Sequence, residues 1–185
     1  MTLIDALPFP LSAPVNVRDF AGLRTQHGQI SSGFALRADD LSIADAVSAQ
    51  DLVDRHGVTA VIDLRSAEEV SLTGRGPLGL LPVNYHHLPL MTDLSASVDD
   101  PRRFLDQASF GSLYVRIVER SAAQLVAALA VIAQSRGTVA FHCAAGQDRT
   151  GVLAAMLLLG LDPRSWTRCR FGYAASARVA DVVAA

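Results

Sequence analysis

The stretch Thr138-Val-Ala-Phe-His-Cys-Ala-Ala-Gly-Gln-Asp-Arg-Thr-Gly151 decides the fold of this chain. Its residues 138–142 form a short run of β-branched and apolar side chains, which predicts a buried strand. Residues 150–161 have the composition of an apolar helix that begins directly after Arg149. Five residues separate Cys143 from Arg149, so a short loop connects the strand to the helix.

This loop has the features of a cup for a tetrahedral oxyanion. Its backbone N–H groups can point inward, and the start of the following helix adds the positive end of its dipole. Ala144, Ala145 and Gly146 are small, which lets an anion approach the backbone, and Gly146 tolerates a positive φ. The planar guanidinium of Arg149 can hold two oxygens of the anion, which a lysine does less well.

The same loop contains a candidate nucleophile. Cys143 lies at the floor of the cup, where the N–H groups and the helix dipole stabilise its thiolate. A thiolate that faces a bound phosphoryl group is placed for in-line attack, and the cup stabilises the charge on the transferred group. Thr150 offers a hydroxyl that can hydrogen-bond the thiolate, and His142 can orient the loop through backbone groups.

The leaving oxygen of such a reaction needs a proton, and two carboxyl groups are candidate donors. Asp148 lies inside the loop and is the first choice, both as general acid and as the group that activates water in a second step. Asp93 is the second choice and belongs to the polar segment 89–110, which we interpret as a flap. The alternatives are a purely structural Asp148 and a leaving group that needs no single acid.

The rest of the chain alternates short apolar runs with helical patterns. This order predicts an α/β fold in which helices flank a mostly parallel central sheet. We expect strands at 58–64 and 83–88, and helices at 42–56, 114–135 and 165–183. We also expect a hairpin at 23–37 and a loop at 65–81.

Composition narrows the class of protein further. The chain has 185 residues, 50% of them hydrophobic and 18% charged. We therefore expect one globular domain over residues 1–185, with an extended lead-in at 1–15. A net charge of −2 gives no strong attraction to nucleic acid or to anionic membranes. Without a bilayer-length apolar run or a basic N-terminal segment, we predict a cytoplasmic protein with no membrane insertion, while export without a signal peptide stays open.

Three segments resemble one known family. The segment His142–Gly151 resembles the signature of the cysteine-dependent tyrosine and dual-specificity phosphatases. Two further segments, Asn16-Val-Arg-Asp-Phe-Ala-Gly22 and Asp63-Leu-Arg-Ser66, resemble the bacterial branch that includes the mycobacterial protein tyrosine phosphatase B. The resemblance covers most of the chain, from about Asn16 to the last expected helix.

The resemblance implies hydrolysis of a phosphate monoester in two steps, through a phosphocysteine and without a metal or other cofactor. It makes Cys143 the nucleophile, Arg149 the phosphate clamp and Asp148 the acid. The residues that it implies for phosphate binding are Ala144, Ala145, Gly146, Gln147, Asp148 and Arg149. His142, Thr150, Asp63 and Arg65 are supporting residues, and we interpret the last two as a structural ion pair. The expected partners are a phosphotyrosine protein or peptide, and inorganic phosphate or another oxyanion in the loop.

Two departures from the family pattern bear on the substrate. Gln147 stands where the family has a lysine, so we predict weaker activity on phosphoinositides. The segment 92–110 is short for a paired-helix lid, which suggests a more open site. Dual specificity, phosphoinositide hydrolysis, a non-catalytic phosphate-binding module and a rhodanese-like sulfurtransferase remain the alternatives.

Overall fold

A computed structural model describes residues 16–25, 28–90 and 107–161 of the chain. Five strands in this part form a sheet in the order β1-β4-β7-β5-β6. The last four run parallel, and β1 pairs antiparallel with β4 at one edge. The strands are β1 (Arg18–Asp19), β4 (Ala35–Ala38), β7 (Thr138–His142), β5 (Val58–Asp63) and β6 (Asn84–His87). The predicted α/β fold with a mostly parallel sheet is confirmed.

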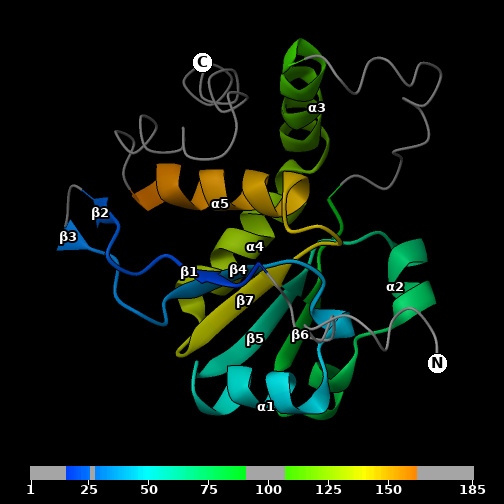
Figure 1. Cartoon of the computed structure of the whole chain (residues 1–185). Coiled ribbons are helices and arrows are strands. Elements are labelled where there is room, and N and C mark those ends of the chain that lie inside the picture. Colours follow the sequence, from blue (N-terminus) through cyan, green and yellow to red (C-terminus); the bar gives the residue numbers. More distant parts are fainter. Residues whose placement is uncertain (1–15, 26–27, 91–106, 162–185) are drawn as a thin grey trace.

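Helices cover the two faces of the sheet (Figure 1). α1 (Ala46–Asp54) lies on one face, with the short 3-10 turns η2 (Leu41–Ile43) and η3 (Pro77–Leu80) beside it. α4 (Ala122–Gln134) and α5 (Asp148–Leu161) cover the other face, and α3 (Gln107–Arg120) packs against both of them.

Burial on both faces fixes the register of the middle strand, β7. Its five residues are all buried. Phe141 packs into the apolar layer that contains Leu153 of α5, and Ala140 packs into the layer that contains Leu52 of α1. Because successive side chains point to opposite faces, a shift by one residue would place each in the wrong layer. The position of the loop that follows β7 is therefore set by the core.

The predicted strands at 58–64, 83–88 and 138–142 are confirmed, and the helix expected at 42–56 contains α1. The observed hairpin is shorter than the one expected at 23–37. It consists of β2 (Arg24–Thr25) and β3 (Gly28–Gln29), which pair with each other apart from the main sheet. The chain then passes into β4, which lies parallel to β7 because its apolar residues complete the core.

The loop predicted at 65–81 is wrong. Residues of this segment form the helix α2 (Ala67–Thr73) and the turn η3. Ser66 accepts a hydrogen bond from the backbone N–H of Glu69, whose carboxylate in turn accepts one from the N–H of Ser66. This reciprocal capping box stabilises the start of a short helix that has no apolar face of its own.

The prediction of a single helix at 114–135 is also wrong, because this segment belongs to two helices. The backbone leaves the helical region at Ser121, where φ is −118° and ψ is 24°. α3 ends at Arg120, and α4 starts at Ala122 in a new direction (Figure 1). α3 begins at Gln107, inside the segment assigned to a flap.

Several predictions lie outside the described residues: the lead-in at 1–15, most of the flap with Asp93, and the helix at 165–183. Within the described residues, no helix combines the length and the apolar character that crossing a membrane requires.

A buried arginine joins the ends of the strands beneath the loop that follows β7. Arg65 is 1% exposed, and its Nη2 lies 2.6 Å from Asp63 Oδ2. Its Nη1 donates to Asp40 and to Thr73 Oγ1, and its Nη2 also donates to the carbonyl of Gly74. Although burial opposes ionisation of Asp63, the hydrogen bonds from Arg65 hold the pKa of that carboxyl at about 2. Asp63 and Arg65 thus form an ion pair, as the sequence suggested.

We expect Arg65→Met to lower the free energy of unfolding by about 3–5 kcal/mol, because it leaves the buried Asp63 carboxylate without its counter-charge. Arg55→Met is the matched control, since it breaks an ion pair on α1 in which the arginine side chain is 78% exposed. Its effect should stay within about 0.5 kcal/mol. Urea unfolding of both variants measures the difference, and equal effects would contradict the structural role of Arg65.

Candidate active site

The loop formed by residues 143–147 leaves the carboxyl end of β7, between the ends of β4 and β5. Ligands of open α/β sheets bind at this edge. α5 begins at Asp148, two residues before the predicted start, so its positive end adjoins the loop directly. The topology thus joins three strand ends and one helix start at a single place.

Neighbouring groups hold the loop carbonyls on its outer side. The backbone N–H of Asp40 donates to the carbonyl of Ala144 at 3.2 Å, and Nη2 of Arg37 donates to the carbonyl of Gly146 at 2.8 Å. Gly146 has a φ of 65°, and a Cβ added there would lie 2.7 Å from the carbonyl oxygen of Ala38. Carbonyls turned outward leave the loop N–H groups for its inner side, where they can bind an anion.

The candidate nucleophile is buried next to the hydroxyl that was expected to support it. Cys143 is 2% exposed, and Thr150 Oγ1 donates a hydrogen bond to its Sγ over 3.1 Å. Thr150 itself is fully buried in α5. A hydroxyl held against sulfur stabilises the thiolate, both before an attack and when sulfur is the leaving group.

The ring of His142 contacts backbone groups, which is the kind of contact expected of a residue that orients the loop. The backbone N–H of Leu41 donates to Nδ1 of His142 at 3.3 Å, which places the ring proton on Nε2. Nε2 lies 3.6 Å from Asp63 Oδ2. Burial lowers the pKa of His142, so the ring is neutral at pH 7. Its role is to connect the end of β7 to the Arg65 network.

Arg149 is held by a partner that sequence analysis missed. Glu69 of α2 accepts hydrogen bonds from Nη1 and Nη2 of Arg149, at 2.5 Å and 2.8 Å. The hydrogen bond from Arg149 keeps the pKa of Glu69 low. The hydrogen bonds to Glu69 use Nη1 and Nη2, so the edge of the guanidinium that carries Nε can still face an anion. The capping-box pattern Ser66-Ala-Glu-Glu69 was the sequence signal for this helix and its glutamate.

Asp148 also has an unforeseen partner. Tyr114 of α3 donates a hydrogen bond from its hydroxyl to Oδ1 of Asp148 over 2.6 Å. Tyr114 is 6% exposed, and Asp148 is half-buried at the first position of α5. The separation of 34 residues between the two gave no local signal in the sequence.

The structure therefore brings together nearly all of the predicted site. Ala144, Ala145 and Gln147 are exposed along the loop, whereas Gly146 is buried against β4. In the described part of the chain, no group of three or more His, Cys, Asp or Glu side chains is arranged to hold a metal ion.

A sequence model of the tyrosine phosphatase family matches residues 9–170. The chain belongs to the tyrosine phosphatase family. This phosphatase is a cysteine-dependent hydrolase of the kind that acts without a metal ion, and the cysteine of its loop is the buried Cys143. Among curated proteins, no sequence matches it significantly.

Solved structures of phosphatases share low identity with this phosphatase. Kinase-associated phosphatase, with its catalytic-site cysteine substituted by serine, is 18% identical over 72% of this chain and 67% of that chain, with a TM-score of 0.42. TpbA of P. aeruginosa is 22% identical over 68% of this chain and 58% of that chain, with a TM-score of 0.32. A TpbA cysteine-to-serine variant in complex with phosphotyrosine gives 22% identity and a TM-score of 0.31, over 68% and 57% of the two chains. This phosphatase thus spans somewhat more than half of the TpbA chains.

We expect Gly146→Ala to destabilise this phosphatase by about 1–3 kcal/mol and to lower its activity at least about tenfold. The reason is a strained positive φ together with a clash against the carbonyl of Ala38. Gly160→Ala in α5 is the matched control, because nothing described lies within 4 Å of a Cβ added there. The control should be neutral or gain up to about 1 kcal/mol. Thermal unfolding and aryl phosphate turnover measure both variants, and an active, stable Gly146→Ala protein would refute this account of the loop.

We expect Glu69→Gln to lower kcat/KM for an aryl phosphate about tenfold, and to raise the inhibition constant of inorganic phosphate, because the Arg149 guanidinium loses its charged bidentate support. Glu68→Gln is the control, since Glu68 lies next to it in α2 and points to solvent. Unchanged phosphate inhibition in Glu69→Gln would show that Glu69 does not position Arg149.

Proposed function

We propose that this phosphatase hydrolyses phosphotyrosine in proteins and peptides through a phosphocysteine on Cys143. One observation carries the proposal: where the loop meets α5, the buried sulfur of Cys143 accepts a hydrogen bond from the Thr150 hydroxyl, and Glu69 fixes Arg149. Nucleophile and anion clamp are thereby oriented by separate partners on the two sides of the same cup. Preorganised groups of this kind account for most of the catalysis in phosphoryl transfer.

The first step breaks the ester bond. Sγ of Cys143 attacks phosphorus, an S–P bond forms, and the P–O bond to the tyrosine ring breaks. Asp148 supplies the proton that the leaving phenolate oxygen takes up. Because Tyr114 donates to Oδ1 of Asp148, Oδ2 is the oxygen that carries this proton.

The second step regenerates the enzyme. A water molecule attacks phosphorus from the side that the tyrosine has left, the S–P bond breaks, and the water proton passes to Asp148. Thr150 donates its hydrogen bond to the departing sulfur, which leaves as thiolate. Asp93 stays the second candidate for the acid.

Three features favour phosphotyrosine over other phosphate esters. Cys143 is buried, and a long, flat side chain such as phosphotyrosine suits a buried nucleophile. Gln147 carries no charge at the exposed rim, which disfavours a phosphoinositide. Apart from Gln147, the loop and the segments 16–22 and 63–66 also resemble the tyrosine phosphatases of the bacterial branch that includes the mycobacterial enzyme. We further propose that residues 1–185 are one catalytic domain.

The experiment that tests the proposal compares three proteins on an aryl phosphate in the presence of EDTA. Wild type should turn over, and Cys143→Ser should be inactive while still binding vanadate. Asp148→Asn should lose about 10²–10⁴-fold in kcat, most strongly with a poor leaving group. Asp54→Asn on α1 is the matched control and should retain full activity.

Other outcomes select the alternatives. Vanadate binding without turnover in wild type would indicate a phosphate-binding module, and thiosulfate:cyanide activity would indicate a sulfurtransferase. A strong preference for a phosphoinositide over a phosphotyrosine peptide would contradict the proposed substrate. Full activity in Asp148→Asn would exclude this residue as the acid.

A further inference from the structure

Two arginines stand directly opposite each other beside the phosphate loop. Arg18 of β1 and Arg37 of β4 are partners in the antiparallel ladder. Residues opposite each other on neighbouring strands point to the same face of the sheet, so the two side chains are neighbours. Ala35, two residues before Arg37, belongs to the apolar layer that contains α5, so this face is the one that α5 covers.

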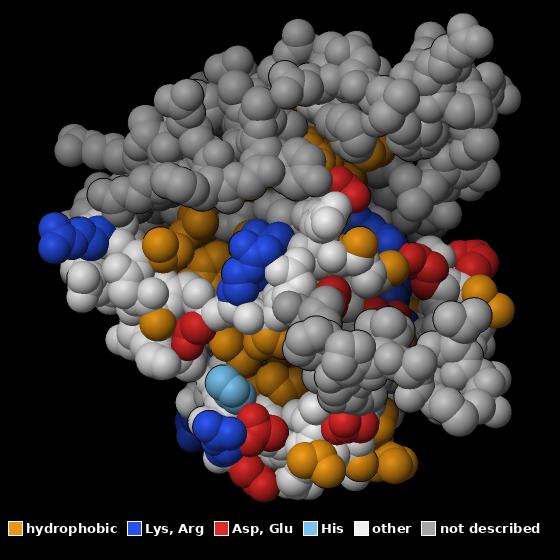
Figure 2. Space-filling view, viewed as in Figure 1, with side chains coloured by type: hydrophobic (Ala, Val, Ile, Leu, Met, Phe, Trp, Pro, Cys, Tyr) orange, Lys and Arg blue, Asp and Glu red, His pale blue; other side chains and the backbone are white. Residues whose placement is uncertain are grey.

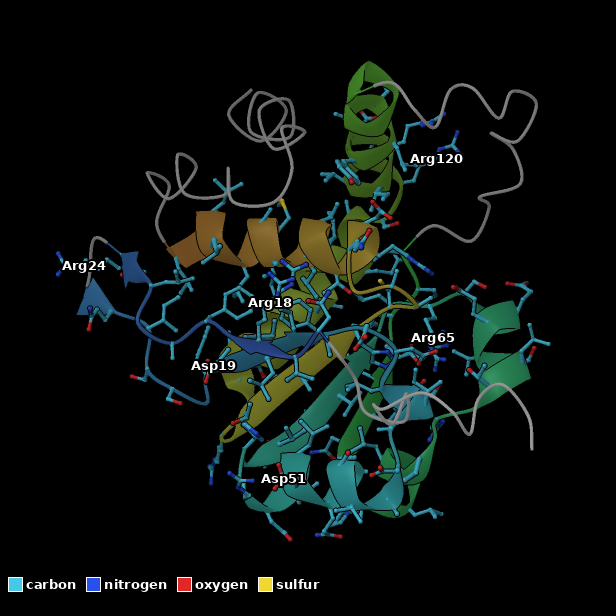
Figure 3. The ribbon with its side chains drawn as sticks, viewed as in Figure 1. Arg18, Asp19, Arg24, Asp51, Arg65 and Arg120 are labelled. Carbon is cyan, nitrogen blue, oxygen red and sulfur yellow. The ribbon has the colours of Figure 1, made fainter. Side chains whose placement is uncertain are left out.

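Figure 3 places Arg18 between β1 and α5, and Figure 2 shows basic side chains gathered near the middle of the same view. Arg37 connects this cluster to the loop, because its Nη2 donates to the carbonyl of Gly146.

Among the described residues, no carboxylate compensates the charges of this pair. Neither arginine forms an ion pair with a carboxylate within the described residues. Nε and Nη2 of Arg18 donate to the neutral side-chain oxygen of Asn16, at 3.0 Å and 2.5 Å. Nε of Arg37 is buried and has no hydrogen-bond partner among the described residues.

Two facing cations without a counter-ion are unfavourable in the free protein. Like charges directly opposite each other destabilise a sheet, and a partly buried guanidinium gains most from a paired anion. Burial and the charge of Arg18 both lower the pKa of Arg37, which is the direction expected for an excess of positive charge. An anion that bridged the pair would remove both costs.

We propose that Arg18 and Arg37 form a second anion subsite, which binds an acidic side chain flanking the phosphotyrosine of a peptide substrate. The inference rests on the proposed function and deepens it by naming a substrate feature. A peptide is favoured over a polyphosphorylated lipid because the rim residue Gln147 adds no further cation. The pair would therefore select acidic phosphopeptides and raise their capture through charge complementarity.

The test uses two matched phosphotyrosine peptides. One has glutamates on both sides of the phosphotyrosine, and the other has glutamines at the same positions. Wild type should prefer the acidic peptide about three- to tenfold in kcat/KM at low salt, and less at high salt. In Arg18→Gln this ratio should fall about threefold. Arg18→Lys keeps the charge and should retain most of the preference.

Arg55→Gln is the matched control, because it removes the same charge from α1 and should leave the ratio unchanged. If Arg18→Gln and Arg55→Gln both lost the preference for the acidic peptide, the effect would be one of net charge, and the subsite would be overturned. Equal hydrolysis of the two peptides by wild type would overturn it as well, while the proposed function would stand.

If wild type hydrolysed neither peptide, the proposed function would fail and the subsite with it. The competing substrate is a bisphosphorylated phosphoinositide. If wild type hydrolysed it faster than the acidic peptide and Arg18→Gln lost that preference, the pair would be assigned to a lipid and the peptide subsite would be overturned.

Discussion

The buried guanidinium of Arg65 is the group on which the geometry of the active site depends. It joins Asp63 at the end of β5, Asp40 after β4, and Thr73 and Gly74 at the end of α2. Asp40 and Asp63 follow or end the two strands that flank β7, so the network lies beside the point where the phosphate loop begins. A buried charge requires a closely held partner of opposite charge, because an unpaired carboxylate in the interior costs several kcal/mol of folding free energy. Apolar packing sets the register of β7, and the network adds a polar connection between the ends of β4, β5 and α2 beside it.

The network reaches the chemistry through two short paths. One runs from Asp63 to His142, and from there into the backbone of the loop. The other runs along α2 to Glu69, which holds Arg149. A helix of seven residues without buried side chains has little packing energy of its own. Its capping box and its attachment to Arg65 thus supply the rigidity with which Glu69 orients the phosphate clamp.

Local chemistry predicted the parts of this site that lie within one segment. The strand, the loop and the apolar helix, and the candidate roles proposed for Cys143, Arg149 and Thr150, follow from a continuous stretch of sequence. Glu69 and Tyr114 could not be predicted in the same way, because their contacts span 80 and 34 residues. Glu69 was hidden further because glycines and prolines around α2 favoured a loop, although Ser66 and Glu69 had the capping-box spacing. The break at Ser121 was hidden because apolar spacing continues across it.

Compensation of positive charge decreases from the core of the site to its rim. Arg65 faces two carboxylates, Arg149 faces the one carboxylate of Glu69, and Arg37 and Arg18 donate to a carbonyl and an amide. A fully paired cation contributes structure but attracts no ligand, whereas a cation without a carboxylate attracts an anion and gains from binding it. Anions are therefore drawn to the clamp and to the rim, not to the network beneath. The same residue type thus holds the fold together at one depth and selects substrate at another, and its number of acidic partners decides which.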